Sequence, residues 1–197
     1  MMGIKKCPFV KEIKMKRMLL KKIVMSVLAL ASLSVFLLTS GCAANAIRMV
    51  PTDFEVVNKH HHTVSINESI GGRETNPLWT SQVSNSAFTE ALSNALAKSG
   101  VFQAVIKGGG ADYLLDVTIL DYDQPWIGID IDIRMKTKWE LADAKTLVPV
   151  WSDTFETTYR AKLSDALIAA ERLQKANEGS VRTNIKEGIR RLSLLSL

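Results

Sequence analysis

Four aspartates form two D-x-D pairs in the middle of the chain, Asp121 with Asp123 and Asp130 with Asp132. Carboxylates at this spacing can hold Ca²⁺ or Mg²⁺ through their oxygens, or act as an acid and a base. The second pair, however, continues an alternating row of charged residues that includes Arg134. Cross-strand pairing of charges on a solvent-facing strand explains such a row without a ligand. We therefore expect a solvated row of charges, and an enzyme that uses these four carboxylates is the alternative.

The other residues of metal-ligating type are His60-His61-His62, the only histidines of the chain. Consecutive residues of a strand point to opposite faces, so these three imidazoles cannot all reach one ion. The two cysteines, Cys7 and Cys42, are too few for a disulfide framework or a four-ligand zinc site. The sequence therefore predicts an exposed, pH-sensitive histidine patch, and neither a metal nor another cofactor.

Other catalytic signatures are missing from the sequence. No serine stands in a G-x-S-x-G motif, and Gly108-Gly109-Gly110 is not followed by the Lys-Ser/Thr of a phosphate loop. The three glycines are expected to form a hairpin-like turn. Trp79 and Trp126 lie in or near predicted loops, which makes them candidates for partner contact, with burial over a sheet end as the alternative.

The positive charge of the chain is concentrated at its N-terminus. The 197 residues carry a formal net charge of +5, but residues 1–41 hold eight of the 25 basic and one of the 20 acidic residues. Residues 42–197 are left with 17 basic and 19 acidic residues, a net charge of −2. Because no basic footprint remains there, we expect no nucleic-acid partner.

Residues 23–38 form an uncharged apolar stretch directly after Lys21-Lys22. A helix of that length spans about 24 Å, less than the ~30 Å hydrocarbon core of a bilayer. Basic residues, a short apolar stretch and then small residues are typical of an export signal. Residues 1–41 are therefore predicted to be a signal peptide, in which residues 1–14 precede the more ordinary start at Met15.

The end of this leader, Thr39-Ser40-Gly41 followed by Cys42, resembles the bacterial lipobox, although Thr39 stands where leucine is usual. The resemblance implies cleavage between Gly41 and Cys42, and diacylglycerol and N-acyl (palmitate-type) chains on Cys42. Three acyl chains give stable anchoring, whereas one holds only marginally. Ala43 replaces the aspartate that commonly retains such proteins at the inner membrane, which favours the outer membrane. An ordinary signal peptide, or a membrane anchor with an incidental cysteine, is the alternative.

The chain after Cys42 is expected to form a lipidated tether over residues 42–55 and one periplasmic α+β domain over residues 56–197. The strongest signal is the alternation of apolar and charged residues over 129–141, which is typical of a strand with one face on a core and one in water. Pro149 cannot donate a ladder hydrogen bond, so the strand that follows it is expected at a sheet edge.

The remaining elements follow from the same periodicities. The predicted strands lie at 63–66, 101–106, 113–119, 129–141 and 150–159. Helices are predicted at 86–99 and from Ser164 onward, with Asp165 as a cap and a kink at Gly179. The sequence therefore predicts a mainly antiparallel sheet of four to five strands, with two principal helices packed on one face.

Several of these segments resemble a known group of proteins. They are FTEALSNALAKSGVF (88–102), ADYLLDVTI (111–119), the WEL-x₉-W hairpin (Trp139–Trp151) and EGSVRTNIKEGIRRLSLL (178–195). Together with Cys42 they look like small envelope lipoproteins with a TolB-amino-terminal-like domain, which include auxiliary lipoproteins of ABC-type lipid transport systems. This resemblance brings no catalytic residues, and it implies a binding or assembly role in the envelope.

The expected function is thus that of a non-enzymatic outer-membrane lipoprotein with an envelope protein as its partner. An accessory role in ABC-type lipid transport is the first specific hypothesis. Contact with cell-wall or pilus machinery is the second, and a periplasmic enzyme using Asp121, Asp123, Asp130 and Asp132 is the third.

The first test concerns the anchor. Cys42→Ser removes the thiol that the lipobox resemblance assigns to lipid, so the variant should lose acyl label and leave the membrane fraction while its domain stays folded. Mass spectrometry and fractionation measure the first two outcomes, and circular dichroism measures the third. An intact leader or an unmodified Cys42 thiol in the exported protein would contradict the prediction.

Overall fold

A computed structural model describes residues 21, 45–73, 82–125 and 128–197 of the chain. The chain divides into two compact units, Met1–Gly41 and Cys42–Leu197, and every described residue except Lys21 belongs to the second. The elements of this unit, in chain order, are α2 (Ala46–Met49), β1 (His60–Ile66), α3 (Asn85–Ser99), β2 (Phe102–Val105), β3 (Tyr113–Asp123), β4 (Ile131–Asp143), β5 (Pro149–Ala161), the 3₁₀ turn η1 (Leu163–Asp165) and α4 (Ala169–Leu192). Within the described ranges, no helix has both the length and the apolar character needed to cross a bilayer.

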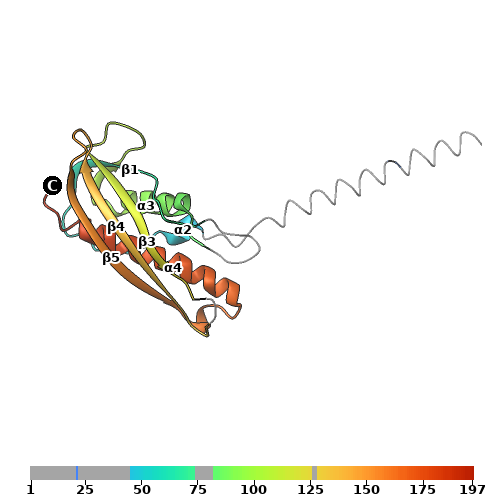
Figure 1. The fold of residues 1–197 in the computed structure, drawn as a ribbon. Coiled ribbons are helices and arrows are strands. Elements are labelled where there is room, and N and C mark those ends of the chain that lie inside the picture. The colour runs from blue at the N-terminus through green and yellow to red at the C-terminus, as the bar shows by residue number, and fades with distance from the viewer. Residues whose placement is uncertain (1–20, 22–44, 74–81, 126–127) are drawn as a thin grey trace, which may run out of the picture. The chain divides into compact units, whose positions relative to one another are not determined.

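The sheet has the strand order β2-β1-β3-β4-β5 and is mixed (Figure 1). β1 runs parallel to β2 and to β3, whereas β3, β4 and β5 pair antiparallel. The α+β class is confirmed, but the prediction of a mainly antiparallel sheet is wrong. The helix α3 connects β1 to β2, and a crossover of this kind is what a parallel pair requires.

The expected hairpin at Gly108-Gly109-Gly110 is also wrong. These glycines connect β2 to β3, and β1 lies between those two strands in the sheet. The connection therefore passes over the end of a neighbouring strand, which a two-residue hairpin turn cannot do.

The alternation predicted over 129–141 is confirmed for residues 131–141 in β4, but it is wrong for Ile129, which lies before the strand and is 75% exposed. Its inner row is buried and consists of Ile131, Ile133, Met135, Thr137, Trp139 and Leu141. Arg134, Lys136 and Lys138 lie on the exposed outer row. β5 is an edge strand that begins at Pro149, as the missing proline N–H predicts.

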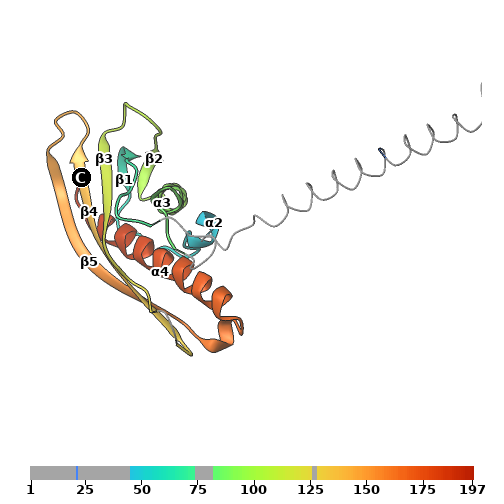
Figure 2. The same cartoon turned by 45° about the vertical axis from the view of Figure 1, so that its right-hand side comes forward.

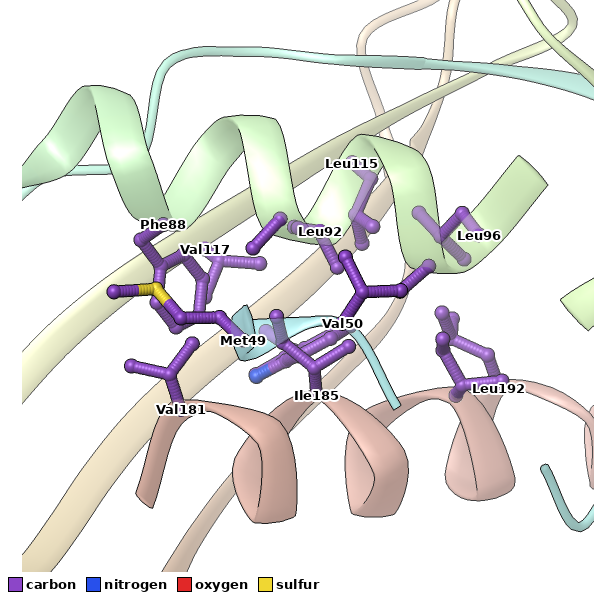
Figure 3. Close-up of a cluster of buried hydrophobic side chains, with 14 of the residues drawn as sticks. Met49, Val50, Phe88, Leu92, Leu96, Leu115, Val117, Val181, Ile185 and Leu192 are labelled. Carbon is purple, nitrogen blue, oxygen red and sulfur yellow. The ribbon is translucent and has the colours of Figure 1, made fainter. Parts of the chain in front are cut away.

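Helices cover one face of the sheet, and the other face is open (Figure 2). α4 packs against β4 and β5, and α3 packs against β2. Figure 3 shows where the layers meet: Met49 and Val50 lie between the apolar faces of α3 and α4. The core is therefore built from both helices, the sheet and the short segment that precedes β1.

A helix occupies part of the segment that was expected to be a tether. Residues 46–49 form α2, and Ala46, Met49 and Val50 are buried. The segment is held because the N–H of Asn45 donates to Oε1 of Glu178 at 3.2 Å. Among the described residues, the packed segment is present from Asn45, three positions after Cys42, because the apolar side chains of α2 fill the space between α3 and α4.

The C-terminal helix begins later than the sequence predicts. Oδ2 of Asp165 accepts from the N–H of Lys162 at 2.7 Å, so the expected cap belongs to η1. Ala166 and Ile168 have extended backbone, and α4 starts at Ala169 without a side-chain cap.

The predicted kink at Gly179 is replaced by close packing. α4 is continuous from Ala169 to Leu192, and a Cβ added at Gly179 would overlap the ring of Tyr159. A Cβ at Gly188 would overlap the ring of Trp139, which is fully buried. Both glycines therefore let aromatic rings of the sheet lie against the backbone of α4.

Gly188→Ala tests this packing. The added methyl meets a ring that cannot move into solvent, so the free energy of unfolding should fall by about 1–3 kcal/mol. Urea denaturation measures the change. Gly109→Ala, where a Cβ meets open space and the φ angle is not positive, is the matched control and should stay within about 0.5 kcal/mol of the parent. An unchanged Gly188→Ala variant would contradict the close-approach interpretation.

Candidate binding surfaces

Four residues singled out from the sequence lie outside the described residues. They are Gly41 and Cys42 at the predicted cleavage and lipidation site, and Trp79 and Trp126 as possible partner contacts. Their roles stay predictions.

The four aspartates lie at the outer surface, where basic residues of neighbouring strands pair with two of them. Arg160 donates from Nε and Nη2 to the two carboxylate oxygens of Asp132, at 2.6 and 2.7 Å, and this bidentate pair holds the pKa of Asp132 below its usual value. Arg134 pairs with Asp123 across β3 and β4 through a single contact, from its Nη2 to Oδ2 of the aspartate. Cross-strand charge pairs thus account for these two carboxylates, as the alternation indicates.

Asp123, Asp130 and Asp132 line one shallow hollow together with Arg134 and Arg160, whereas Asp121 is not part of its lining. Asp121 lies opposite Lys136 in the ladder, and Oδ1 of Asp130 accepts from the N–H of Leu163 at 3.1 Å. Among the described residues, no group of three or more acidic, histidine or cysteine side chains is placed to hold a metal ion. The four aspartates therefore form a charged outer surface.

The three histidines have different surroundings in β1. His60 is buried, its Nε2 lies 3.0 Å from the carbonyl oxygen of Leu192, and its ring packs on Phe102. His61 is exposed, whereas His62 is half-buried with its ring edge against Tyr113. The predicted exposed patch is thus confined to His61, because β1 continues further toward its N-terminus than expected.

A buried polar seam between α4 and the sheet was missed by the sequence reasoning. Thr137 donates to Oδ1 of Asn184 at 3.0 Å, and Nδ2 of Asn184 donates to Thr157 at 3.2 Å. Two helical turns earlier on α4, Oδ1 of Asn177 accepts from the hydroxyl of Tyr122 at 2.6 Å. The sequence did contain a signal for it, because Thr137 and Asn184 are polar residues at inward positions of the strand period of β4 and the helical period of α4. These bonds position α4, and burial raises the pKa of the Tyr122 phenol.

A hollow of about 220 Å³ lies beside this seam. Val83, Ile119 and Leu173 give it apolar walls, while Tyr122 and Asp123 give it polar ones. Tyr122 and Asp123 are already bonded to Asn177 and Arg134, and Arg73, Gln82 and Gln124 also line the hollow.

A cluster of charges joins the C-terminal half of α4 to β5. Arg191 donates to Asp153 at 2.6 Å and to Glu187 at 2.7 Å, with its guanidinium 4.4 Å from the centre of the Phe155 ring. Hydrogen bonds from Arg190, and then from Arg191, lower the pKa of Glu187 to about 2, although burial opposes the shift. The cluster ties the edge strand to the helix.

The turn between β4 and β5 exposes three apolar side chains. Leu147, Val148 and Val150 are 66, 58 and 49% exposed. Oδ1 of Asp143 accepts from the N–H of Thr146 at 2.8 Å, and the backbone N–H of Leu147 donates to the carbonyl of Asp143 at 2.8 Å. The turn is therefore fixed by its own hydrogen bonds.

The backbone of this turn is strained at Leu147. Its φ angle of 58° lies in the left-handed region, which bulky side chains rarely adopt. A conformation of this kind costs on the order of 1–3 kcal/mol and tends to occur where function requires it. We therefore regard the turn as the candidate binding surface of the domain.

Solved structures share the α+β fold of this chain, although no protein-family model and no curated protein matches its sequence. Protein XCC0632 from Xanthomonas campestris, of the DUF330 family, has a TM-score of 0.57 at 12% identity, over 77% of this chain and 94% of that one. A minor lipoprotein from Acinetobacter baumannii has a TM-score of 0.45 at 8% identity, over 68% and 94% of the two chains. Lipoprotein GNA1162 from Neisseria meningitidis has a TM-score of 0.36 at 14% identity, over 51% and 84%. The likeness to XCC0632 shows the fold and assigns no residue a role.

The charge cluster predicts a dependence of stability on pH. Since the folded pKa of Glu187 is lowered to about 2, its stabilising effect is present above the ordinary glutamate pKa of about 4.3 and is lost as the pH falls toward 2. Solvent screens these half-exposed pairs, so Glu187→Gln should lower the free energy of unfolding at pH 7 by about 1 kcal/mol.

Urea denaturation between pH 2 and pH 7 measures this effect. The difference between parent and Glu187→Gln should shrink across the acid limb, whereas Glu90→Gln, at an exposed position of α3, should track the parent. A difference that stays constant down to pH 2 would show that Glu187 acts through packing.

Proposed function

We propose that this chain is an outer-membrane lipoprotein, anchored through Cys42, whose periplasmic domain binds a protein of the envelope without catalysing a reaction. The observation that carries the proposal is the β4–β5 turn, which exposes Leu147, Val148 and Val150 on a rigid, strained backbone. Contiguous exposed apolar side chains mark interaction sites, and a bulky side chain is unusual in the left-handed region.

The adjoining edge strand supplies a second means of binding. Among the described strands, β5 pairs with β4 alone, so the other edge of its 13 residues faces no strand. Unpaired backbone groups on such an edge can accept an extended segment of another chain. Val150 belongs to this strand, so the apolar turn and the free edge form one continuous surface.

The sequence resemblance supports a transport accessory as the first specific function. In that case the partner is a component of an ABC-type lipid transport system, and permease and substrate-binding genes should lie beside this one. A partner from cell-wall or pilus machinery is the second candidate. An enzyme using Asp121, Asp123, Asp130 and Asp132 has less support, because two of these carboxylates form ion pairs with arginines and Asp121 does not line the hollow that the other three share.

Photo-crosslinking in intact cells tests the proposal. A crosslinking residue in place of Val148 should capture an envelope protein that the same residue in place of Lys98, exposed in the last turn of α3, does not capture. The double variant Asp123→Asn with Asp130→Asn should keep this crosslink. The identity of the captured protein separates transport from cell-wall or pilus machinery, and identical products from Val148 and Lys98 would contradict the proposal.

Leu147→Asn separates binding from stability. Asparagine tolerates the left-handed region better than leucine, so the free energy of unfolding should stay the same or rise by up to about 1 kcal/mol. The Val148 crosslink should nevertheless fall several-fold, because one apolar contact is lost. A destabilised variant with an unchanged crosslink would show that Leu147 serves the fold.

A further inference from the structure

A second exposed apolar cluster lies at the opposite end of β4 and β5. It consists of Ile129, Leu163, Leu167 and Ile168, which are 75, 43, 84 and 66% exposed. These side chains come from two short segments, one before β4 and one around η1. We call them the apolar corner. Apolar side chains gathered in this way mark a contact surface.

The apolar corner is held in place by a buried arginine. Arg172 is 5% exposed, and its two terminal nitrogens donate to the carbonyls of Ala166 at 2.7 Å and of Gly128 at 3.3 Å. One guanidinium therefore fixes both segments of the corner. The bond from the N–H of Leu163 to Asp130 adds a third link. These bonds fix the backbone of both segments, so the exposed side chains of the apolar corner are held in place.

The short stretch of chain between Cys42 and α2 indicates what this surface contacts. Packed structure starts at Asn45, whose N–H is bonded to the buried carboxylate of Glu178. Two residues lie between Cys42 and Asn45, so the Cα atoms of these two residues are three steps apart and at most about 11 Å from each other. A bilayer that holds acyl chains of Cys42 must therefore lie within about that distance of Asn45.

The apolar corner lies close to the point on α4 where Glu178 holds Asn45. Glu178 holds Asn45, and Arg172, six residues earlier on α4, braces the corner, which is about 9 Å along the helix axis. A groove lined by Ile47, Arg48, Asp165, Lys175 and Arg182 connects the two sites. α2 and the first turns of α4 lie on the same side of the sheet in both views (Figures 1 and 2).

We propose that the apolar corner rests on the surface of the lipid bilayer that holds the acyl chains of Cys42. This inference rests on the lipid anchor of the proposed function. Ile47 of α2, which is 71% exposed and followed by the exposed Arg48, forms the near end of the same contact. Apolar side chains then enter the interface while basic groups meet anionic headgroups. The domain thus touches the membrane at two points, and the β4–β5 turn faces away from it.

Fluorescence quenching by lipids tests this contact with the mature, acylated protein in vesicles of phosphatidylethanolamine and phosphatidylglycerol. Because Cys42 carries lipid and Cys7 leaves with the leader, an introduced cysteine is the only free thiol. An NBD label on Leu167→Cys should be quenched by doxyl-labelled lipid roughly twofold or more over the same label on Thr158→Cys, at an exposed position of the outer row of β5. With Leu167→Asp and Ile168→Asp present, a label on Ile129→Cys should lose its quenching, because charges leave the interface.

The outcomes separate the two proposals. A protein without acyl mass that does not float with the vesicles contradicts the lipid anchor. An anchored protein whose Leu167 label is quenched no more than the Thr158 label overturns the bilayer contact alone. A label that is shielded without vesicles, increasingly so at higher protein concentration, also overturns it, since a second copy then covers the corner.

Discussion

The close approach of α4 to β4 and β5 is the constraint on which the rest of the domain depends. Gly179 and Gly188 leave room for the rings of Tyr159 and Trp139 against the helix backbone. Asn184 then bonds to a threonine of each strand, and the indole N–H of Trp139 donates to Thr137 at 3.0 Å. A shift of α4 by one turn would put side chains where the glycines are and would leave buried amides unsatisfied. The helix therefore has one permitted position on the sheet.

This position of α4 also sets the two ends of the domain. The N-terminal part of the helix carries Arg172, which braces the apolar corner, and its middle carries Glu178, which receives Asn45. Its C-terminal part carries Arg191, which ties down β5 below the exposed turn. With 13 residues in β5, at about 3.3 Å per residue, the corner and the turn are about 40 Å apart. One helix thus fixes the apolar corner at one end of the domain and the exposed turn at the other.

The sequence predicted those features that depend on a regular period. The alternation of β4 identified its buried and exposed rows, and the apolar stripe over 86–99 identified α3 within one residue. The parallel pairing of β1 was missed because a strand of seven residues with three histidines shows little alternation. α2 was missed because four residues carry no period, and their burial depends on a gap between two distant helices.

The candidate surfaces also differ in whether the sequence could predict them. The solvated row of aspartates follows from local alternation, so it could be predicted. The turn at Leu147 could not, since glycine or asparagine is the usual signal for a left-handed residue and leucine gives none. The polar seam requires knowledge of which helix faces which strand, because Thr137 and Asn184 are 47 positions apart in the chain.

The attachment of the N-terminal segment to the middle of α4 has a mechanical consequence. Besides the Asn45 bond, Arg182 donates to the carbonyl of Arg48, and Lys186 pairs with Asp53, so three contacts follow one another along the helix. Tension applied through the N-terminus, as between an anchor and a moving partner, is then shared among these contacts in shear. A pull along the helix axis would load all three contacts together, whereas a pull away from the helix would break the Asn45 bond first.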